Sequence, residues 1–255
     1  MGGSGKDHLS GALITPVPDQ NLPYYAPVRE SSTNPEALIE QLADAPAQEV
    51  VTSVVEQFGD GVALACSFQK EESVLLHMLS EAGVTPRVFA LDTGVLFDET
   101  YATWKEFESR FGIEIDARKG ISLEEQEADF GPALWETQPD ACCRIRKIEP
   151  LQKALAELDA WITGVRRVQA PTRANAAKFE RDVANGLWKA NPLADWDDDQ
   201  VWAYIREHDL PYNALHDNGY SSIGCTHCTQ PGEGREGRWA GEAKTECGLH
   251  PSDKS

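Results

Sequence analysis

The order of apolar and polar positions predicts alternating helices and strands from residue 34 onward. In residues 34–58, leucines and valines return at helical spacing around a break at Pro46. Residues 62–66 form a short apolar run after two glycines, and its length and flanks indicate a buried strand. An amphipathic segment from about residue 73 to 82 follows and predicts a helix. A strand, a loop and a helix in this order are the start of a parallel α/β unit.

The pattern then repeats along the chain. Asp98 is a candidate N-cap, and Ser122 with Glu125 three residues later has the sequence signature of a capping box. The expected strands are residues 87–91, 113–115 and 161–165, and the expected helices start at Asp98, at Ser122 and after Asp197. We therefore predict an α/β fold with a mostly parallel sheet, helices on both of its faces and an irregular C-terminal tail.

The chain divides into three parts. Residues 1–33 mix Gly, Ser, Pro and Asp without periodicity and are expected to be a flexible leader. Residues 34–240 are assigned to one α/β domain, and residues 241–255 to a mobile tail. In parallel sheets, ligands bind beyond the carboxyl ends of the strands. We expect three loops to converge there, at residues 67–73, 92–95 and 164–173.

Composition and charge narrow the choice of ligand. The net charge of −19 argues against generic nucleic-acid binding, which depends on a basic face. The basic residues gather at 144–147, 166–173 and 235–238, which is typical of a pocket for a small polyanion, although each group alone could be solvated surface charge.

No segment approaches the roughly 20 consecutive apolar residues of a membrane helix, and the first thirty residues lack a secretory signal. We expect a soluble, cytoplasmic protein without a membrane partner; the sequence leaves open whether it forms a homo-oligomer.

The six cysteines are too few for a secreted disulfide scaffold, and their clustering indicates metal binding and catalysis in a reducing compartment. Cys142, Cys143, Cys225 and Cys228 offer four thiolates, the complement of either a tetrahedral zinc or a [4Fe-4S] cluster. Adjacent cysteines are difficult to direct onto one zinc ion, whereas a cube with several iron corners accepts them. A [4Fe-4S] cluster is therefore favoured over zinc and over unmetallated thiols. Cys66 ends an apolar strand and is expected to be a small buried side chain.

The loop at residues 67–73 can cradle an anion with backbone N–H groups and a helix N-terminus. It resembles the pyrophosphate-binding loop of adenine nucleotide alpha hydrolases, with Phe68, Gln69 and Lys70 in place of the usual glycines. In lacking these glycines, the loop is similar to that of the adenylyl-sulfate and phosphoadenylyl-sulfate reductases, the branch that binds a nucleotide without cleaving ATP. The resemblance continues from about residue 61 to 250 in the sequences LDTG, GVRR with TR, LPYNALHDNGYSSIGCTHCTQP and ECGLH.

The resemblance implies an adenine nucleotide alpha hydrolase-like fold and a specific reaction. Members with the CC and CxxC set bind a [4Fe-4S] cluster, here through Cys142, Cys143, Cys225 and Cys228, and mostly reduce adenosine 5'-phosphosulfate. Cys247 of ECGLH would attack the sulfur and form an S-sulfocysteine, and thioredoxin or a similar dithiol protein would release sulfite, in assimilatory sulfate reduction and cysteine biosynthesis.

The predicted substrate contacts are spread over several loops. They are Ser67, Phe68, Gln69, Lys70, Glu72, Ser73, Leu91, Asp92, Thr93, Gly94, Lys147, Gly164, Arg166, Arg173, Arg235 and Arg238. Lys147 lies one helical turn after Cys143; without the resemblance it would be a surface lysine on a helix ending near Pro150.

Other functions explain fewer of these features. A reductase that prefers the 3'-phosphorylated nucleotide stays open, because one additional basic residue in a loop could decide it. An ATP-dependent adenylyltransferase or thiolase would need a Gly-rich loop with a magnesium-binding Asp, which residues 67–73 lack. A metal-binding redox sensor module would leave the three anion loops and the tail unexplained. The histidines at 77, 216, 227 and 250 show no metal-ligand spacing and are expected to be structural.

Overall fold

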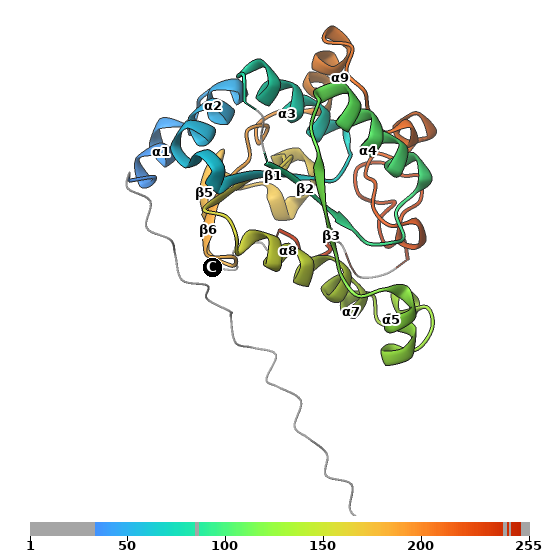
Figure 1. The fold of residues 1–255 in the computed structure, drawn as a ribbon. Helices are drawn as coiled ribbons and strands as arrows, with labels where there is room; N and C mark the ends of the chain where they lie inside the picture. Colours follow the sequence, from blue (N-terminus) through green and yellow to red (C-terminus); the bar gives the residue numbers. More distant parts are fainter. Residues whose placement is uncertain (1–33, 85–86, 242–243, 245, 251–255) are drawn as a thin grey trace, which may run out of the picture.

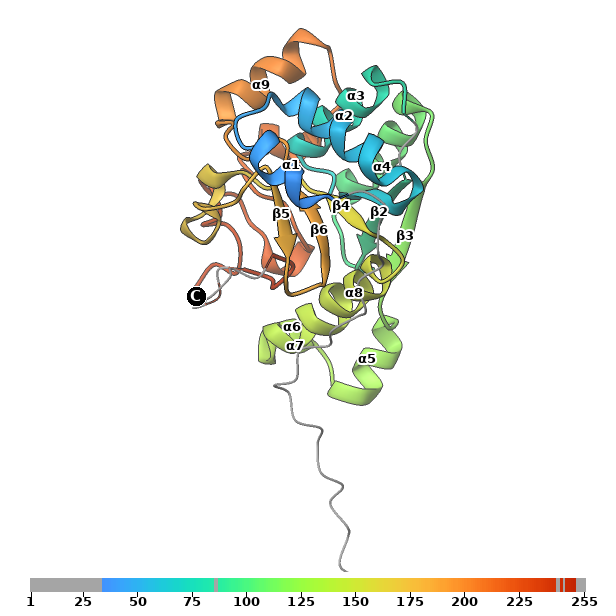
Figure 2. The ribbon, with the colours of Figure 1, turned by 90° about the vertical axis from the view of Figure 1, so that its left-hand side faces the viewer.

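A six-stranded sheet forms the centre of the computed structural model, which describes residues 34–84, 87–241, 244 and 246–250 (Figures 1 and 2). The predicted leader and the last five residues of the predicted tail lie outside the described residues. The strand order is β3-β2-β1-β4-β6-β5, and every neighbouring pair is parallel except β5 with β6. The strands are β1 (Val62–Cys66), β2 (Arg87–Asp92), β3 (Ile115–Lys119), β4 (Ala160–Ile162), β5 (Phe179–Asp182) and β6 (Leu187–Ala190).

Helices cover both faces of this sheet, which confirms the predicted fold class (Figure 1). One face is buried by α2, α3, α4 and α9 in a large apolar core, and α8 packs on the other face around Leu151, Leu155 and Trp161. The helices are α1 (Glu36–Gln41), α2 (Ala47–Phe58), α3 (Lys70–Glu81), α4 (Asp98–Phe111), α5 (Leu123–Phe130), α6 (Leu134–Thr137), α7 (Pro139–Cys143), α8 (Glu149–Leu155) and α9 (Asp198–Glu207).

The strands that follow β1 in the chain are added first on one side of it and then on the other. From β1 the chain moves to β2 and β3 on one side, and β4, β6 and β5 lie on the other. In open parallel sheets, the crevice at such a switch point is where ligands bind. The fold therefore places the loops after β1, β2 and β4 at one common site.

Several predicted element boundaries are confirmed. The break at Pro46 separates α1 from α2, and Ser122 caps α5 by accepting a 3.1 Å hydrogen bond from the backbone N–H of Glu125. Asp197 caps α9 in the same way, through the backbone N–H of Gln200 at 2.8 Å. Both are local interactions, which is why the sequence could predict the cap at Ser122 and the start of a helix after Asp197.

Other boundaries differ from the predictions. Helix α3 begins at Lys70, before the predicted start at about residue 73. The backbone N–H of Gln69 donates to the Glu72 carboxylate (3.0 Å), and this cap starts the helix ahead of its apolar face. Asp98 is the first residue of α4 and makes no capping bond, since Phe97 occupies the cap position. The third and fourth strands are β3 and β4, each shifted from its expected residues; Ile113 instead packs as a loop residue against the core.

Two features were not predicted at all. Strands β5 and β6 form an antiparallel hairpin at the sheet edge, and the mixed polar sequence of β5 hides it from pattern reasoning. Helices α7 and α8 are joined by a π-helical turn (Arg144–Ile148), so the helix does not end near Pro150 as predicted. Pro150 lies in the first turn of α8, where its missing N–H costs little.

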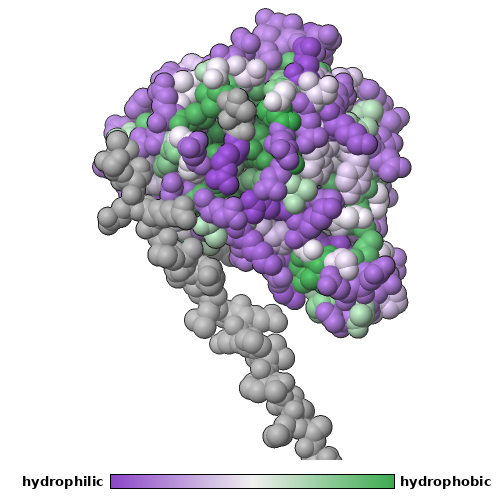
Figure 3. Space-filling model, in the orientation of Figure 1, coloured by the Kyte–Doolittle hydropathy of each residue, from purple (hydrophilic) through white to green (hydrophobic). Residues whose placement is uncertain are grey.

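The face of the molecule in view in Figure 3 is mainly hydrophilic, with hydrophobic areas near the upper centre and at the lower right. Within the described residues, no helix has both the length and the apolar character required to cross a membrane.

Candidate active site

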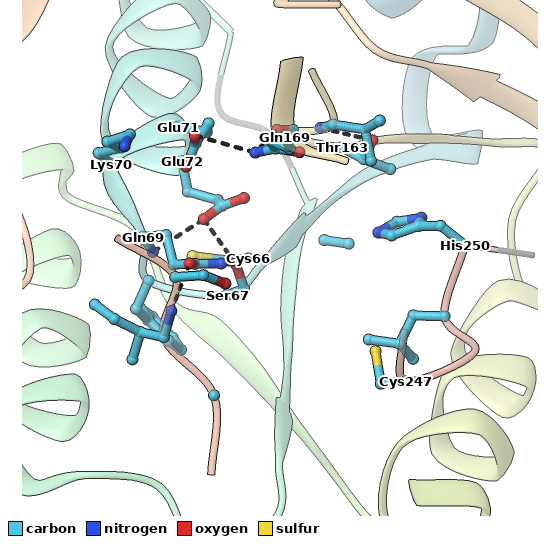
Figure 4. Close-up of a pocket in the computed structure, with 18 of the residues that line it drawn as sticks. Cys66, Ser67, Gln69, Lys70, Glu71, Glu72, Thr163, Gln169, Cys247 and His250 are labelled. Atoms are coloured by element: carbon cyan, nitrogen blue, oxygen red, sulfur yellow. Dashed lines mark hydrogen bonds between the residues drawn. The ribbon is translucent and has the colours of Figure 1, made fainter. Parts of the chain in front are cut away.

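A cavity of about 370 Å³ lies at the carboxyl ends of β1, β2 and β4, as the switch point predicts. Its volume is within the range of small-molecule sites. The three predicted loops contribute to its wall, and the C-terminal segment closes it from the opposite side (Figure 4). The predicted site residues on the wall are Ser67, Phe68, Gln69, Lys70, Glu72, Leu91, Thr93, Lys147, Gly164, Arg166, Arg173, Arg235, Arg238 and Cys247.

Three predicted substrate contacts lie off this wall. Ser73 is fully buried, and its hydroxyl donates to the backbone carbonyl of Pro211. Asp92 shapes the turn after β2, because its carboxylate accepts hydrogen bonds from the backbone N–H of Gly94 (3.0 Å) and from the Tyr101 hydroxyl (2.7 Å). Gly94 adopts the left-handed backbone conformation (φ +71°) that this turn requires. These residues support the loops that line the cavity.

The first loop is fixed by the carboxylate of Glu72. It accepts hydrogen bonds from the Ser67 hydroxyl at 2.9 Å and from the backbone N–H of Gln69 at 3.0 Å (Figure 4). Burial, assisted by the neighbouring Glu71 carboxylate, raises the pKa of Glu72 to about 8. The Gln69 side chain in turn accepts from the backbone N–H of Ile223 at 2.8 Å, which ties this loop to the segment that carries the CxxC motif.

Arg166 lies on the cavity wall, but protein carboxylates already satisfy its guanidinium. Its Nε donates to Glu71 at 2.9 Å, and its Nη2 pairs with both Glu71 and Asp198. Its Nη1 donates to the backbone carbonyl of Trp196 at 3.2 Å. Arg166 thus joins the loop after β4 to the N-terminal turns of α3 and α9.

The second loop leads to the cysteines. The Thr93 hydroxyl lies 3.3 Å from Sγ of Cys225, and the Thr93 carbonyl accepts a 2.6 Å hydrogen bond from Nη1 of Arg146. Arg146 is buried and also donates to Gln126 at 2.6 Å. The sequence placed Arg146 among the basic residues near the cysteines, but it gave no sign of this structural role.

The four predicted metal ligands come together from two segments. Cys143 packs with Cys228, the Cys228 thiol donates to the backbone carbonyl of Cys225 at 3.7 Å, and Cys142 lies near the thiols of Cys143 and Cys225. Burial and those two neighbouring thiols raise the pKa of Cys142 to about 11. All six cysteines are free thiols. In the described part of the chain, no three His, Cys, Asp or Glu side chains are arranged to hold a single metal ion.

Two cations on the cavity wall beside the cysteines, Lys147 and Arg238, have no carboxylate partner in the described part of the chain. Lys147 is 8% exposed, and Arg238 is 7% exposed. Arg238 donates from Nη1 to the Ser222 hydroxyl and the Ile223 carbonyl, each at 3.2 Å. Its Nε is buried and has no hydrogen-bond partner among the described residues, and its guanidinium carbon lies 4.6 Å from the centre of the Trp239 ring.

The C-terminal segment forms the opposite wall of the cavity. Cys247 is 7% exposed and packs against Cys143 and Trp239. His250 is stacked on Trp161, with ring centroids 5.4 Å apart and an interplanar angle of 17°. Figure 4 shows Cys247 and His250 facing Ser67, Gln69 and Glu72 across the cavity. The nucleophile predicted from sequence and the loop predicted to bind an anion thus share one site.

Sequence reasoning missed several residues of this site. Glu71 and Gln169 lie inside the predicted loops and hold arginines, but the sequence does not reveal which carboxylate or amide meets which guanidinium. Trp239 follows Arg238 directly and packs with Cys143 and Cys247. Glu246, the residue before Cys247, forms ion pairs with two arginines. Its position in the ECGLH sequence was the only signal available for it.

Comparisons with known proteins agree with this geometry. Residues 61–231 match the family model of the phosphoadenosine phosphosulfate reductase domain. A relative from Bacillus cytotoxicus named adenosine 5'-phosphosulfate reductase is 46% identical over 202 residues, which cover 76% of this chain and 86% of that protein. A phosphoadenosine 5'-phosphosulfate reductase from Gloeobacter violaceus is 44% identical over 226 residues, covering 86% of this chain and 94% of its own.

Solved structures give the same answer for the fold. The crystal structure of the phosphoadenylyl-sulfate reductase from Candida auris, a phosphate complex, is similar with a TM-score of 0.68 and 31% identity, over 80% of this chain and 99% of that chain. The FMN adenylyltransferase from Candida glabrata, bound to FMN and an ATP analogue, reaches a TM-score of 0.54 at 14% identity over 81% of this chain and 69% of that chain. This second likeness concerns the fold alone.

Proposed function

This chain belongs to the phosphoadenosine phosphosulfate reductase family, and from this premise we propose that it reduces adenosine 5'-phosphosulfate to sulfite and AMP, with Cys247 as the nucleophile. The observation that carries the proposal is the placement of Cys247 in the same cavity as the three loops beyond β1, β2 and β4. Relatives from Bacillus cytotoxicus and Salinibacter ruber bear the name of this activity at 46% and 41% identity.

The first step is sulfur transfer. The Cys247 thiolate attacks the terminal sulfur of the phosphosulfate, the bond from that sulfur to the bridging phosphate oxygen breaks, and AMP leaves. Lys147 and Arg238 lie on the wall next to Cys247 and favour the negative charge that grows on the departing phosphate. Cys247 now carries a sulfonate as S-sulfocysteine.

The second step returns the enzyme to its starting state. A thiolate of a dithiol protein, thioredoxin or one similar to it, attacks Sγ of Cys247 and expels sulfite, which leaves a mixed disulfide. The second thiol of the dithiol protein then displaces Cys247, so that the two electrons come from the dithiol. In this proposal, the segment that carries Cys247 leaves its docked position after sulfur transfer and brings the sulfonate from the cavity to the dithiol. Sulfite of this origin would feed assimilatory cysteine synthesis.

The four cysteines of the CC and CxxC motifs fit a [4Fe-4S] cluster by their donor chemistry. Cys142, Cys143, Cys225 and Cys228 are free thiols from two segments that converge beside Lys147. When bound, the cluster would supply fixed charge and rigidity at this side of the cavity. Free thiols also suit a reducing compartment, so we place the protein in the cytoplasm.

A second candidate substrate is the 3'-phosphorylated nucleotide, because the relative from Gloeobacter violaceus carries that name at 44% identity. Sulfite release with each nucleotide in parallel decides between the two. A strong preference for the 3'-phosphorylated form would overturn the substrate assignment and leave the role of Cys247 intact.

The role of Cys247 is tested with the Cys247→Ser variant. We expect it to bind AMP like the unchanged protein, to release no sulfite and to form no S-sulfo adduct by mass spectrometry. The other five cysteines of the unchanged protein are the internal control, because only the peptide with Cys247 should gain the sulfonate mass after one turnover without reductant. An adduct on Cys143 or Cys228 would overturn the assignment.

A further inference from the structure

The carboxylate of Glu246 is held by two arginines from different parts of the chain. Its Oε1 accepts from Nε of Arg173 at 3.1 Å and from the Thr172 hydroxyl at 3.2 Å. Its Oε2 accepts from Nη2 of Arg173 at 3.1 Å and from Nη2 of Arg235 at 2.8 Å. The side chains of Arg173, Arg235 and Glu246 are only 10%, 15% and 16% exposed, so solvent screens these pairs less than ion pairs on the surface.

Each of the three guanidinium nitrogens of Arg173 makes a hydrogen bond. Its remaining nitrogen, Nη1, donates to Oε1 of Gln169 at 2.6 Å, and Nε2 of Gln169 donates to Glu71 at 3.1 Å. The anchor of the tail therefore extends through the loop after β4 into the first turn of α3. Arg173 and Arg235 were both predicted to bind the substrate, and the structure places them on the tail carboxylate.

Cys247 directly follows this anchor, and a second contact follows three residues later. Glu246 is fixed on one side of Cys247, and His250 is stacked on Trp161 on the other. Between them, Cys247 is buried against Cys143 and Trp239, and Figure 4 shows it facing the first loop across the cavity. A short segment held at both ends has little freedom to move the thiol away from the cavity.

We propose that Glu246 is a positioning residue, which docks the tail on Arg173 and Arg235 and thereby places Cys247 in the cavity. Among the described residues, Lys147 and Arg238 form no ion pair with a carboxylate, so they remain for the phosphosulfate while the tail is docked. Arg173 and Arg235 thus hold the tail and Lys147 and Arg238 serve the substrate, while Lys70 and Arg166 stay paired with carboxylates of α3 and α9. This division rests on the proposed function, whereas the docking of the tail does not.

Docking is tested without any nucleotide, by the rate at which iodoacetamide alkylates Cys247 in the anaerobically purified full chain. Site-resolved mass spectrometry follows the peptide that contains Cys247. We expect Glu246→Gln to raise this rate about tenfold, because a neutral amide cannot hold both guanidiniums. Glu236→Gln is the matched control: Glu236 is exposed, lies one residue after Arg235, and its carboxylate makes no ion pair or hydrogen bond within the described residues. Equal rates in the two variants would overturn the proposal.

Turnover separates positioning from a general loss of structure. In Glu246→Gln, kcat should fall about tenfold while the KM for the nucleotide changes by less than about twofold, and Glu246→Asp should recover part of kcat. Adding Arg173→Gln to Glu246→Gln should cause little further acceleration of alkylation, because both changes remove the same contact. A raised KM with unchanged kcat would show that Glu246 serves substrate binding and would overturn the proposal. If the unchanged protein forms no S-sulfo adduct, the proposed function fails, and the alkylation rates still decide the docking.

Discussion

A methyl group on Gly224 would lie 2.3 Å from Nη2 of Arg238 and 2.6 Å from its Cζ. The absence of a side chain at Gly224 therefore gives the guanidinium its place beside the Ser222 hydroxyl and the Ile223 carbonyl. The position of Arg238, which we assign to substrate binding, therefore depends on Gly224.

Gly224→Ala should lower the affinity for AMP about ten- to a hundredfold, because the methyl group displaces the Arg238 guanidinium. The free energy of unfolding should change by less than about 1 kcal/mol, since the end of a flexible side chain can move away. Isothermal titration calorimetry and urea unfolding measure the two effects. Arg238→Ala should show the same loss of affinity, and the double variant no additional loss. Additive losses in the double variant would contradict this account.

The two carboxylates that bind Arg166 should contribute very differently to stability. Glu71 is 5% exposed and Asp198 is 58% exposed. Glu71→Ala leaves a buried guanidinium with one partner fewer and should lower the free energy of unfolding by about 3 kcal/mol. Asp198→Ala removes a more exposed carboxylate, which also pairs with the buried Lys70 ammonium at 3.1 Å, and should cost about 1–2 kcal/mol. Urea unfolding of both variants checks the order, and a larger loss for Asp198→Ala would refute the buried pairing.

Glu72 should make the stability of the protein depend on pH. Burial and the neighbouring Glu71 raise its pKa to about 8, so the folded state binds a proton that the unfolded state releases above about pH 4.5. This contribution to stability is present below pH 4.5 and is lost as the pH rises through about 8. Glu72→Gln, which resembles the protonated form, should therefore gain stability relative to the unchanged protein between about pH 5.5 and 8.5, by an amount of the order of a few kcal/mol.

The measurement is urea unfolding of both proteins at each pH. Glu125→Gln is the control, because the hydrogen bonds from Ser122 lower the pKa of Glu125 and place its titration below this window. Its stability relative to the unchanged protein should stay constant across the window. Parallel stability curves for Glu72→Gln and the unchanged protein would show that Glu72 is already ionised in the fold.

The sequence predicted those elements of the fold that depend on local patterns. The run Val62–Cys66, the capping box at Ser122, the helix after Asp197 and the break at Pro46 each need only a few neighbouring residues, and each is confirmed. The hairpin of β5 and β6 was missed because its stability comes from pairing at the sheet edge and from the packing of Phe179 on Trp188. Neither contact leaves a periodic pattern of apolar residues in the sequence. The π-helical turn has no sequence pattern that distinguishes it from an α-helix.

The site was predictable as a set of residues and not as a set of contacts. Most of the residues named by the motifs line one cavity, because the topology of a parallel sheet brings its loops together. They did not reveal that Arg166 is neutralised by Glu71, or that Arg173 is held by Glu246, since each pair joins residues more than seventy positions apart. Distances of this kind are set by the tertiary fold alone.

Phe68 tests whether a residue predicted to contact the substrate contributes to core packing instead. It was predicted to bind the substrate, but its ring is 1% exposed and is stacked on Trp104 of α4 with centroids 4.7 Å apart. Phe68→Ala should therefore lower the free energy of unfolding by about 3–5 kcal/mol. Its backbone has a φ of +60°, a conformation that costs a residue with a Cβ about 1–2 kcal/mol relative to glycine. Phe68→Gly should consequently be at least as stable as Phe68→Ala.

Phe107 provides the matched comparison. It is fully buried in α4, its ring centroid lies 6.1 Å from that of Phe68, and its backbone is helical. Glycine in a helix is less stable than alanine by about 1 kcal/mol, so Phe107→Gly should unfold more easily than Phe107→Ala. Urea unfolding of the four variants compares the two orders directly. If the glycine variant were less stable than the alanine variant at both positions, the left-handed backbone at Phe68 would not be maintained in solution. The first loop would then have to approach the nucleotide with a different shape.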